Sequence, residues 1–532
     1  MVKQLKFASS NCPLHYFAFM SNHRLLIFLY TSIILFLFGS CSKATHEFDV
    51  KPNVIIIYTD DVGYGDIQAM GGKIPTPHID GLINNGLLLT NAYATAATCT
   101  PSRYALLTGE YAWRARGRGV AAGDAVALIR PERETLPKVF KKAGYTTGVI
   151  GKWHLGLGEG NGPNWNGKIS PGPLEIGFDY SFLIPATGDR VPTVFVENHH
   201  VVNLDPNDPI AVSYKDKIGE QPTGKENPEL LTTMWSHGHD QTIVNGISRI
   251  GYMKGGESAL WRDEDIADQL LTKAYTFIDE NQKNPFFMYF ATHDIHVPRI
   301  AHERFQGTTE FGPRGDVLVQ LDYTVGALIA HLKEKGLFDN TMIIFSSDNG
   351  PVLDDGYVDG AKEKVGDHRP AGPLRGGKYS AFEAGTKVPL IVHWPGKVAT
   401  GRSSALFSQV DLLASFAALY DVQYDHQMAK DSEPLLDVLL GKSETGRKGL
   451  VQEAIQNVLS YVSSDGFKYI PAHQGPSIVP WGTEIETGFL PEGQLFNLND
   501  DPAETTNLAN QNPQKVQELD SALKLVKEGL AK

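Results

Sequence analysis

The chain has 532 residues, too many for one simple core, so its length favours two domains or one large domain with an appendage. A hydrophobic content of 42% and a charged content of 20% are those of an ordinary folded protein. The formal net charge of −13 argues against a general nucleic-acid binder, because phosphates would not be neutralised, although a local basic pocket could still bind an anion.

Residues 1–41 predict a targeting segment. A basic start at "HRLL" leads into an apolar run that ends in small residues before Cys41, which is typical of a secretion signal. The alternative is a transmembrane anchor, but the run from Leu25 to Phe38 is short against a span of about 20 residues. Met20 offers an alternative translation start.

The end of this segment, "FGSC", resembles the lipobox of bacterial lipoproteins, in which the cysteine carries lipid. The resemblance implies that Cys41 becomes a lipidated N-terminus and that the protein is exported. We therefore expect a lipid-anchored protein of a bacterial envelope, in the periplasm or on the cell surface.

Four apolar runs predict strands buried on both faces of a parallel sheet. Each run ends in polar residues: "NVIIIYTDD" (53–61), "TTGVIGKWH" (146–154), "NPFFMYFATHDIHVP" (284–298) and "TMIIFSSDNG" (341–350). Ligands of open α/β sheets bind beyond the carboxyl ends of the strands, so these polar residues are expected to converge on one crevice.

Helices are expected between these strands. Apolar residues at helical spacing predict amphipathic helices over 263–281 and 315–336, the second ending at Gly336. Residues 155–260 are rich in loops, which fits either a pocket rim or a solvated insertion. Short alternating strands from about residue 445, followed by a helix over 512–529, predict a small antiparallel sheet. The expected fold is thus α/β, with a large, mostly parallel sheet over 50–440 and a smaller C-terminal subdomain over 445–532.

Cys99 lies in the stretch "AATCTPSRYALLTGEY" (96–111) and admits three interpretations: a buried small hydrophobe, half of a disulfide, or a reactive group. The disulfide fails, because Cys12 would be removed with the signal and Cys41 would carry lipid. Thr100 and Pro101 predict a helix start, with Thr100 as the N-cap.

Cys99 would then lie at the amino end of that helix, where the helix dipole favours an anion. Arg103 follows one helical turn later, so its guanidinium can fold back toward the same point. A thiolate nucleophile would fit this position, and an inert buried cysteine stays open as the alternative.

Two motifs make a resemblance specific. "CTPSR" matches the C-x-P-x-R motif of the type I sulfatases, and "GYTTGVIGKWHLG" (144–156) matches the second signature of that family. The likeness runs from about residue 51 to residue 509. It implies an alkaline-phosphatase-like fold and the oxidation of Cys99 to Cα-formylglycine by a maturation enzyme that recognises Pro101 and Arg103.

The resemblance also implies one Ca²⁺ ion. Carboxylate and amide oxygens are hard ligands suited to this ion, and the aldehyde-derived group at Cys99 adds a further one. The implied ligands are Asp60, Asp61, Cys99, Asp348 and Asn349.

The remaining roles follow from the same resemblance. Arg103 and Lys152 would hold the formylglycine hydrate and the sulfate. His154 would act as a base with a pKa near working pH, and Asp348 could take the proton of the attacking hydroxyl. His296 and Lys378 would contact the sulfate and help protonate the leaving alcohol. His293 is ambiguous, with a surface or supporting position favoured over catalysis.

Five loop residues are expected to contact the substrate: Asp189, Arg190, His199, His368 and Arg369. The motif regions look like those of bacterial carbohydrate sulfatases, which implies a sulfated carbohydrate substrate, with 6-O-sulfated galactose or N-acetylgalactosamine as the expected unit. A phosphonate or phosphodiester hydrolase of the same superfamily is one alternative. A glycan-binding surface lipoprotein that has lost catalysis is the other.

Overall fold

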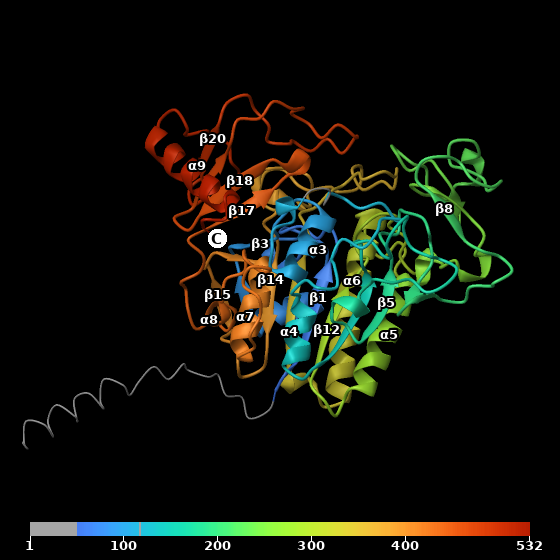
Figure 1. The fold of residues 1–532 in the computed structure, drawn as a ribbon. Coiled ribbons are helices and arrows are strands. Elements are labelled where there is room, and N and C mark those ends of the chain that lie inside the picture. Colours follow the sequence, from blue (N-terminus) through green and yellow to red (C-terminus); the bar gives the residue numbers. More distant parts are fainter. Residues whose placement is uncertain (1–50, 116–118, 532) are drawn as a thin grey trace, which may run out of the picture. The chain divides into compact units, whose positions relative to one another are not determined.

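The computed structural model describes residues 51–115 and 119–531, which belong to one compact unit. The expected signal segment, its Met20 start and the Cys41 lipid site lie outside the described residues. Figure 1 shows a central sheet with helices packed against it and a smaller sheet formed by the C-terminal part of the chain. This is the α/β arrangement predicted from the sequence.

The large sheet has ten strands, and its middle five, in the order β13-β1-β12-β4-β5, run parallel. The four apolar runs predicted to be buried strands are therefore neighbours, and this prediction is confirmed. In sheet order the strands are β15 (Gly401–Ser403), β2 (Leu87–Leu89), β14 (Leu390–His393), β13 (Thr341–Ser347), β1 (Asn53–Thr59), β12 (Phe286–Ala291), β4 (Thr146–Lys152), β5 (Tyr180–Ile184), β6 (Val196–Glu197) and β7 (His200–Val201).

Helices cover both faces of this sheet. Side chains alternate between the two faces along each strand, and in the apolar strands both sets must be buried. In β12, Phe286 and Met288 join a core cluster with α5 and α6, whereas Phe287 stacks on Phe140 of α4 on the other face, with ring centroids 4.0 Å apart. The helices are α2 (Pro77–Asn84), α3 (Cys99–Thr108), α4 (Leu136–Lys142), α5 (Ile266–Glu280), α6 (Gly312–Glu334), α7 (Leu412–Leu419), α8 (Leu436–Leu439) and α9 (Pro513–Lys527).

The predicted helices over 263–281, 315–336 and 512–529 correspond to α5, α6 and α9 within a few residues at either end. Helix α6 ends before Gly336, whose φ of +68° ends the helical path as its sequence position predicted. Within residues 51–115 and 119–531, no helix is both long enough and apolar enough to cross a membrane.

Short elements complete the fold. The loop-rich segment 155–260 holds two-stranded pairs, β8 (Ala211–Ser213) with β11 (Tyr252–Lys254) and β9 (Ile243–Val244) with β10 (Ile247–Ser248). A further pair joins β3 (Ala92–Tyr93) and β16 (Phe407–Ser408). The predicted C-terminal antiparallel sheet is formed by β17 (Gly449–Glu453), β18 (Leu459–Ser463), β19 (Phe467–Ile470) and β20 (Gln494–Asn497), with α9 packed on it.

Candidate active site

The site lies where four parallel strands end at one edge of the sheet. Asp60 and Asp61 follow β1, and Asp348 follows β13. Lys152 is the last residue of β4, and His296 lies in the segment after β12. Because these strands are parallel neighbours, their ends bring the polar residues together, as the sequence predicted.

One half of the site is a buried ion cluster around Asp60 and Asp348. Lys152 Nζ pairs with Asp60 Oδ2 and lies 3.9 Å from Asp348 Oδ2. Arg103 Nε donates a hydrogen bond to Asp348 Oδ2, and Arg103 Nη2 lies 2.8 Å from the same oxygen. Burial raises the pKa of Asp60 well above its ordinary value, and the neighbouring Asp348 carboxylate raises it further. Burial alone would raise the pKa of Asp348, but Arg103 and Lys152 lower it.

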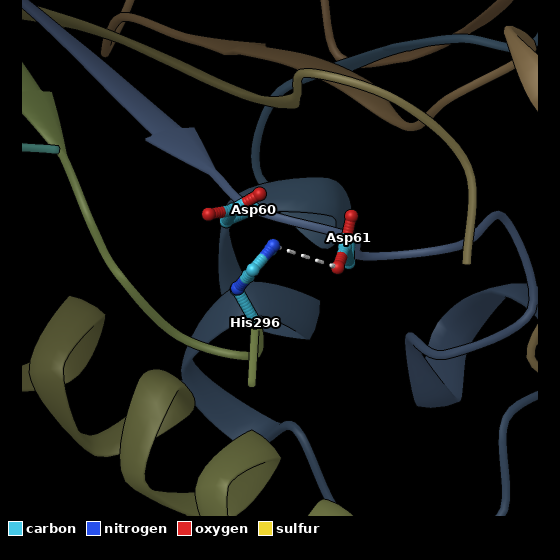
Figure 2. A group of neighbouring side chains, drawn as sticks. All are labelled: Asp60, Asp61 and His296. Carbon is cyan, nitrogen blue, oxygen red and sulfur yellow. Dashed lines mark ion pairs between the residues drawn. The ribbon is translucent and has the colours of Figure 1, made fainter. Parts of the chain in front are cut away.

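The other half of the site surrounds Asp61. Lys378 Nζ lies 2.9 Å from Asp61 and 2.8 Å from Asp355, and Asn349 donates its amide to Asp61 Oδ1 at 2.7 Å. His296 Nε2 is 3.9 Å from Asp61 Oδ2, the contact that Figure 2 shows as a dashed line. Burial alone would lower the pKa of Lys378, but the Asp355 and Asp61 carboxylates raise it well above its usual value. Lys378 therefore carries a fixed positive charge.

Cys99 is the first residue of α3, with Thr98 as the N-cap. The expectation that Thr100 caps this helix was therefore wrong. The Thr100 hydroxyl instead donates to the His154 carbonyl and accepts from the Ala121 amide. Within the part of the chain that the structure describes, Cys99 is a free and buried cysteine. Burial raises the pKa of its thiol above the ordinary value even though Lys152 lowers it. The thiol is thus neutral, which disfavours a thiolate nucleophile.

A cavity of about 300 Å³ opens above Cys99. Five residues expected from the sequence line it, namely Cys99, Asp189, Arg190, His296 and Lys378. Asp60, Asp61, Lys152, Asp348 and Asn349 are buried around its floor. The cavity offers an anion two positive side chains, Arg190 and Lys378, beside the cysteine.

Three histidines of the site, His154, His293 and His296, are buried, and burial lowers the pKa of each. Burial lowers the pKa of His154 well below its ordinary value, and Lys152 lowers it further, so the expectation of a pKa near working pH is not met. Its Nε2 atom hydrogen bonds with the Ala121 carbonyl. The ring of His293 lies 5.9 Å from that of His296 and accepts a hydrogen bond from the Gly188 amide, and its exposure of 5% rules out a surface position. Burial, aided by Lys152, lowers its pKa to about 4.

The residues around the floor fit a hard cation. Among the described residues, the buried oxygens Asp60 Oδ1 and Asn349 Oδ1 have no hydrogen-bond partner. A buried polar atom of this kind lowers the stability of the fold unless a ligand or ion binds to it. Asp60, Asp61 and His296 also place ligand atoms within 4.8 Å of one another (Figure 2), and of these three only the two carboxylates are the oxygen ligands that a hard cation prefers. The sequence predicted the two aspartates as ligands but assigned His296 to the sulfate.

Three predicted substrate contacts lie outside the cavity lining. His199 pairs with Glu175 at 2.8 Å, and the exposed Arg369 hydrogen bonds, among the described residues, to backbone carbonyls of its own loop. His368 is buried and pairs with Asp66 at 2.9 Å, so it belongs to a different cluster. Loop composition could not separate these residues from Asp189 and Arg190, which the structure does bring to the cavity.

Several residues that line the cavity or hold its lining were not predicted from the sequence. Asp355 holds Lys378 and accepts from the Tyr379 hydroxyl at 2.8 Å, and His239 pairs with Asp189 at 2.8 Å. Trp481 reaches the cavity from the C-terminal part of the chain. No motif marks these residues, because their roles depend on how distant loops meet. A weak signal was the tandem "LDDG", in which Asp355 is one of two adjacent acids.

Left-handed backbone also concentrates here. Asp61, His154 and Tyr379 have φ values of +60°, +55° and +78°, a region that residues with a Cβ rarely adopt. Such strain persists only where the surrounding structure demands it, and it clusters at functional sites.

Comparison with known proteins agrees with this geometry. The model of the family described as Sulfatase matches residues 52–422. The chain is 52% identical over 478 residues to an N-acetylgalactosamine-6-O-sulfatase of Bacteroides thetaiotaomicron, covering 90% of this chain and 93% of that protein. It is 30% identical over 470 residues to bovine arylsulfatase A, covering 86% of this chain and 83% of that protein.

Solved structures show the same likeness. A structure from work on the metabolism of multiple glycosaminoglycans by Bacteroides thetaiotaomicron superposes with a TM-score of 0.89 at 52% identity, covering 90% of this chain and 99% of that one. The phosphonate monoester hydrolase of Agrobacterium radiobacter superposes with a TM-score of 0.53 at 18% identity, covering 90% and 95%. The second likeness extends to the fold alone.

Proposed function

This chain belongs to the sulfatase family and is a sulfuric ester hydrolase, and from that premise we propose that it removes sulfate from a sulfated polysaccharide or oligosaccharide. The proposed unit is 6-O-sulfated N-acetylgalactosamine or galactose. The observation that carries this proposal is the 52% identity, over 90% of the chain, to a relative named for that sugar and position. The cavity adds a polar lining beside Cys99, formed by Asp189, Arg190 and His239, which suits sugar hydroxyls.

We propose that Cys99 is converted to formylglycine by a maturation enzyme. When formed, the hydrated aldehyde supplies one hydroxyl that attacks sulfur and a second that later expels sulfate. The position of Cys99 supports this, because it lines the cavity and burial raises the pKa of its thiol, which makes the unmodified side chain a poor nucleophile.

The side chains around Cys99 have complementary tasks in this proposal. Lys378 and Arg190 offer fixed positive charge to the sulfate as it enters the cavity. Lys378 also donates a hydrogen bond toward the ester oxygen, and the neutral His296 can accept or pass a proton there. Arg103 and Lys152 hold Asp348 and Asp60 in place from below.

A calcium ion is the proposed metal. Asp60, Asp61, Asp348 and Asn349 would hold it, because they supply the oxygen atoms that calcium prefers, two of them without a partner. A bound cation would polarise a sulfate oxygen and lower the pKa of the nucleophilic hydroxyl. Elemental analysis of the purified protein tests this proposal, and protein that is fully active without any divalent cation would contradict it.

We also propose that the protein is exported and anchored by lipid on Cys41. This proposal rests on the sequence of residues 20–41 alone. Metabolic labelling with a fatty acid tests it, with Cys41→Ser as the unlabelled control.

The experiment that tests the function is a substrate panel read by released inorganic anion. The purified protein should release sulfate from N-acetylgalactosamine 6-sulfate and from galactose 6-sulfate, and much less from the 4-sulfate isomers. Phenylphosphonate and bis(4-nitrophenyl) phosphate serve as the phosphorus probes. Rapid cleavage of a phosphorus ester, with no sulfate released from any sugar, would overturn the proposal. Binding of the sugar sulfates without turnover would instead favour a glycan-binding protein.

A further inference from the structure

The lining of the cavity has two chemically distinct parts. One part is charged, with Asp189 paired to Arg190 at 3.1 Å and to His239 at 2.8 Å. The other part is aromatic, formed by Tyr379 and Trp481. A sugar ring has the same division, because its hydroxyl groups project at its edges while its C–H bonds leave an apolar face.

Trp481 lies at the turn of a short hairpin in the C-terminal part of the chain. Ile478 bridges to Glu486 across the hairpin, and the Val479 amide donates to the Ile485 carbonyl at 2.8 Å. Residues 475–490 otherwise carry little regular structure. A tryptophan at such a turn would be mobile unless other contacts hold the hairpin.

Two ion pairs hold this hairpin on the catalytic part of the chain. Arg375 binds the Glu486 carboxylate through two parallel hydrogen bonds of 2.7 and 2.6 Å. Lys362 lies 3.0 Å from Glu484 on the same hairpin. A guanidinium and a carboxylate joined by two parallel hydrogen bonds fix their relative orientation as well as their distance. The pair therefore orients the turn of the hairpin relative to the catalytic part of the chain.

The turn also packs directly against the site. The Trp481 ring meets the Tyr379 ring edge-on, with centroids 5.0 Å apart, and the Tyr379 hydroxyl bonds the carboxylate that holds Lys378. The next residue, Gly482, has a φ of +89°, and a Cβ there would lie 2.9 Å from the His237 ring. Only glycine therefore allows the turn to approach the histidine this closely.

Trp481 nevertheless remains 38% exposed, unlike the core residues Trp153 and Trp394, which are 2% exposed. A large flat apolar ring that these contacts place beside the cavity, open to solvent and adjacent to hydrogen-bonding groups, is suited to a ligand with both kinds of surface. In a galacto-configured ring, the C–H bonds at C3, C4 and C5 lie on one face and form such an apolar patch.

We propose that Trp481 is a substrate-binding residue whose indole stacks on the apolar face of the sugar ring that carries the sulfate. This proposal rests on the proposed function, because it needs a sugar in the cavity. The C-terminal hairpin is then part of the specificity site. Trp481 supplies affinity for the ring, whereas Lys378 and Arg190 bind the sulfate whatever it is attached to.

The test measures steady-state hydrolysis of N-acetylgalactosamine 6-sulfate by the full chain, together with inhibition by inorganic sulfate. Trp481→Ala should lower kcat/KM about tenfold, mainly through KM, since an aromatic contact contributes on the order of one factor of ten. Trp481→Phe should retain most of the activity, because it keeps an aromatic face. The inhibition constant of inorganic sulfate should not change in either variant. Leu490→Ala is the matched control, because Leu490 is also 38% exposed and lies outside the cavity lining, and it should behave as wild type.

Two results would overturn the proposal by itself. One is an active wild-type protein whose kcat/KM for the sugar sulfate is unchanged in Trp481→Ala. The other is an equal loss of sugar turnover and sulfate inhibition that Phe does not rescue, which would mark Trp481 as structural. A wild-type protein that cleaves 4-nitrophenyl sulfate but no sugar sulfate would overturn the proposed function and this inference together.

Discussion

Two clusters of buried charged residues are centred on Asp60 and Asp66, which lie six residues apart in the chain, and these two carboxylates differ in how many hydrogen bonds they accept. Asp66 accepts two hydrogen bonds from Arg314, at 2.7 and 2.8 Å, one from His368 at 2.9 Å and one from the Gly63 amide at 2.7 Å. Asp60 is equally buried, yet its Oδ1 atom has no partner among the described residues.

The electrostatics of the two clusters differ accordingly. Burial raises the pKa of both carboxyl groups, but Arg314 and His368 lower that of Asp66 to about 2. The pKa of Asp60 stays raised well above its ordinary value, because burial and the Asp348 carboxylate outweigh Lys152. A buried carboxylate whose two oxygens are both hydrogen-bonded stabilises the fold, whereas a buried carboxylate oxygen without a partner is available to a ligand or ion. Mutations in the two clusters should therefore separate activity from stability.

The largest effect is expected at the cavity floor. Cys99→Ala should lower sulfate release on the order of 10⁴-fold or more, because it removes the proposed nucleophile. The midpoint of thermal unfolding should stay close to wild type, since the side chain borders a cavity. A Cys99→Ala variant that keeps a tenth of the wild-type rate would show that Cys99 is not the source of the nucleophile.

Lys378→Ala should have the next largest effect, and one that depends on the leaving group. Loss of a hydrogen-bond donor to the departing oxygen should slow sugar sulfates by about 10²-fold or more. The loss should be much smaller for 4-nitrophenyl sulfate, whose leaving group departs without a proton. Lys378→Arg retains the charge between Asp61 and Asp355 and serves as the control. Equal losses on both esters would show that Lys378 only binds sulfate.

Asp66→Asn should show the opposite behaviour. It leaves the buried Arg314 guanidinium without its carboxylate, which costs about 3–5 kcal/mol in the free energy of unfolding. The rate per folded molecule should be unchanged. Because the folded pKa lies below the unfolded one, the wild-type protein should lose this stabilisation as pH falls from the ordinary carboxyl pKa toward about 2. Urea unfolding against pH should show that acid-side loss in wild type and not in the variant.

The smallest effect is expected at Arg369, beside the structural cluster. Arg369→Ala should change neither kcat/KM nor stability by more than about 0.5 kcal/mol, since this side chain is exposed and its hydrogen bonds within the described part of the chain go to its own loop. Arg190→Ala, at a cavity-lining arginine, is the informative partner. A loss of activity in Arg369→Ala equal to that in Arg190→Ala would mean that substrate contacts extend beyond the residues that line the cavity.

Much of this arrangement was predictable from residues with local signals. Continuous β-branched runs followed by acids predicted β1 and β13, and parallel pairing then predicted that their ends meet. The C-x-P-x-R and G-K-W-H patterns identified the family and, with it, the implied roles of Cys99, Arg103 and Lys152.

Other features depend on contacts between distant segments. Asp355, His239 and Trp481 reach the cavity only because three separate loops converge there, and no spacing encodes that convergence. His368 looked like a substrate contact because it is a loop histidine beside arginine and glycine residues. Its partner Asp66 lies 302 residues away in sequence, so the sequence alone could not reveal the pair.

The most direct test of the proposed formylglycine nucleophile is mass spectrometry of the Cys99 peptide, taken from the protein fraction that releases sulfate. We expect the mass of an aldehyde in place of the thiol and reaction of that peptide with a hydrazide probe. Fully active protein that carries an unmodified Cys99 thiol would contradict this proposal.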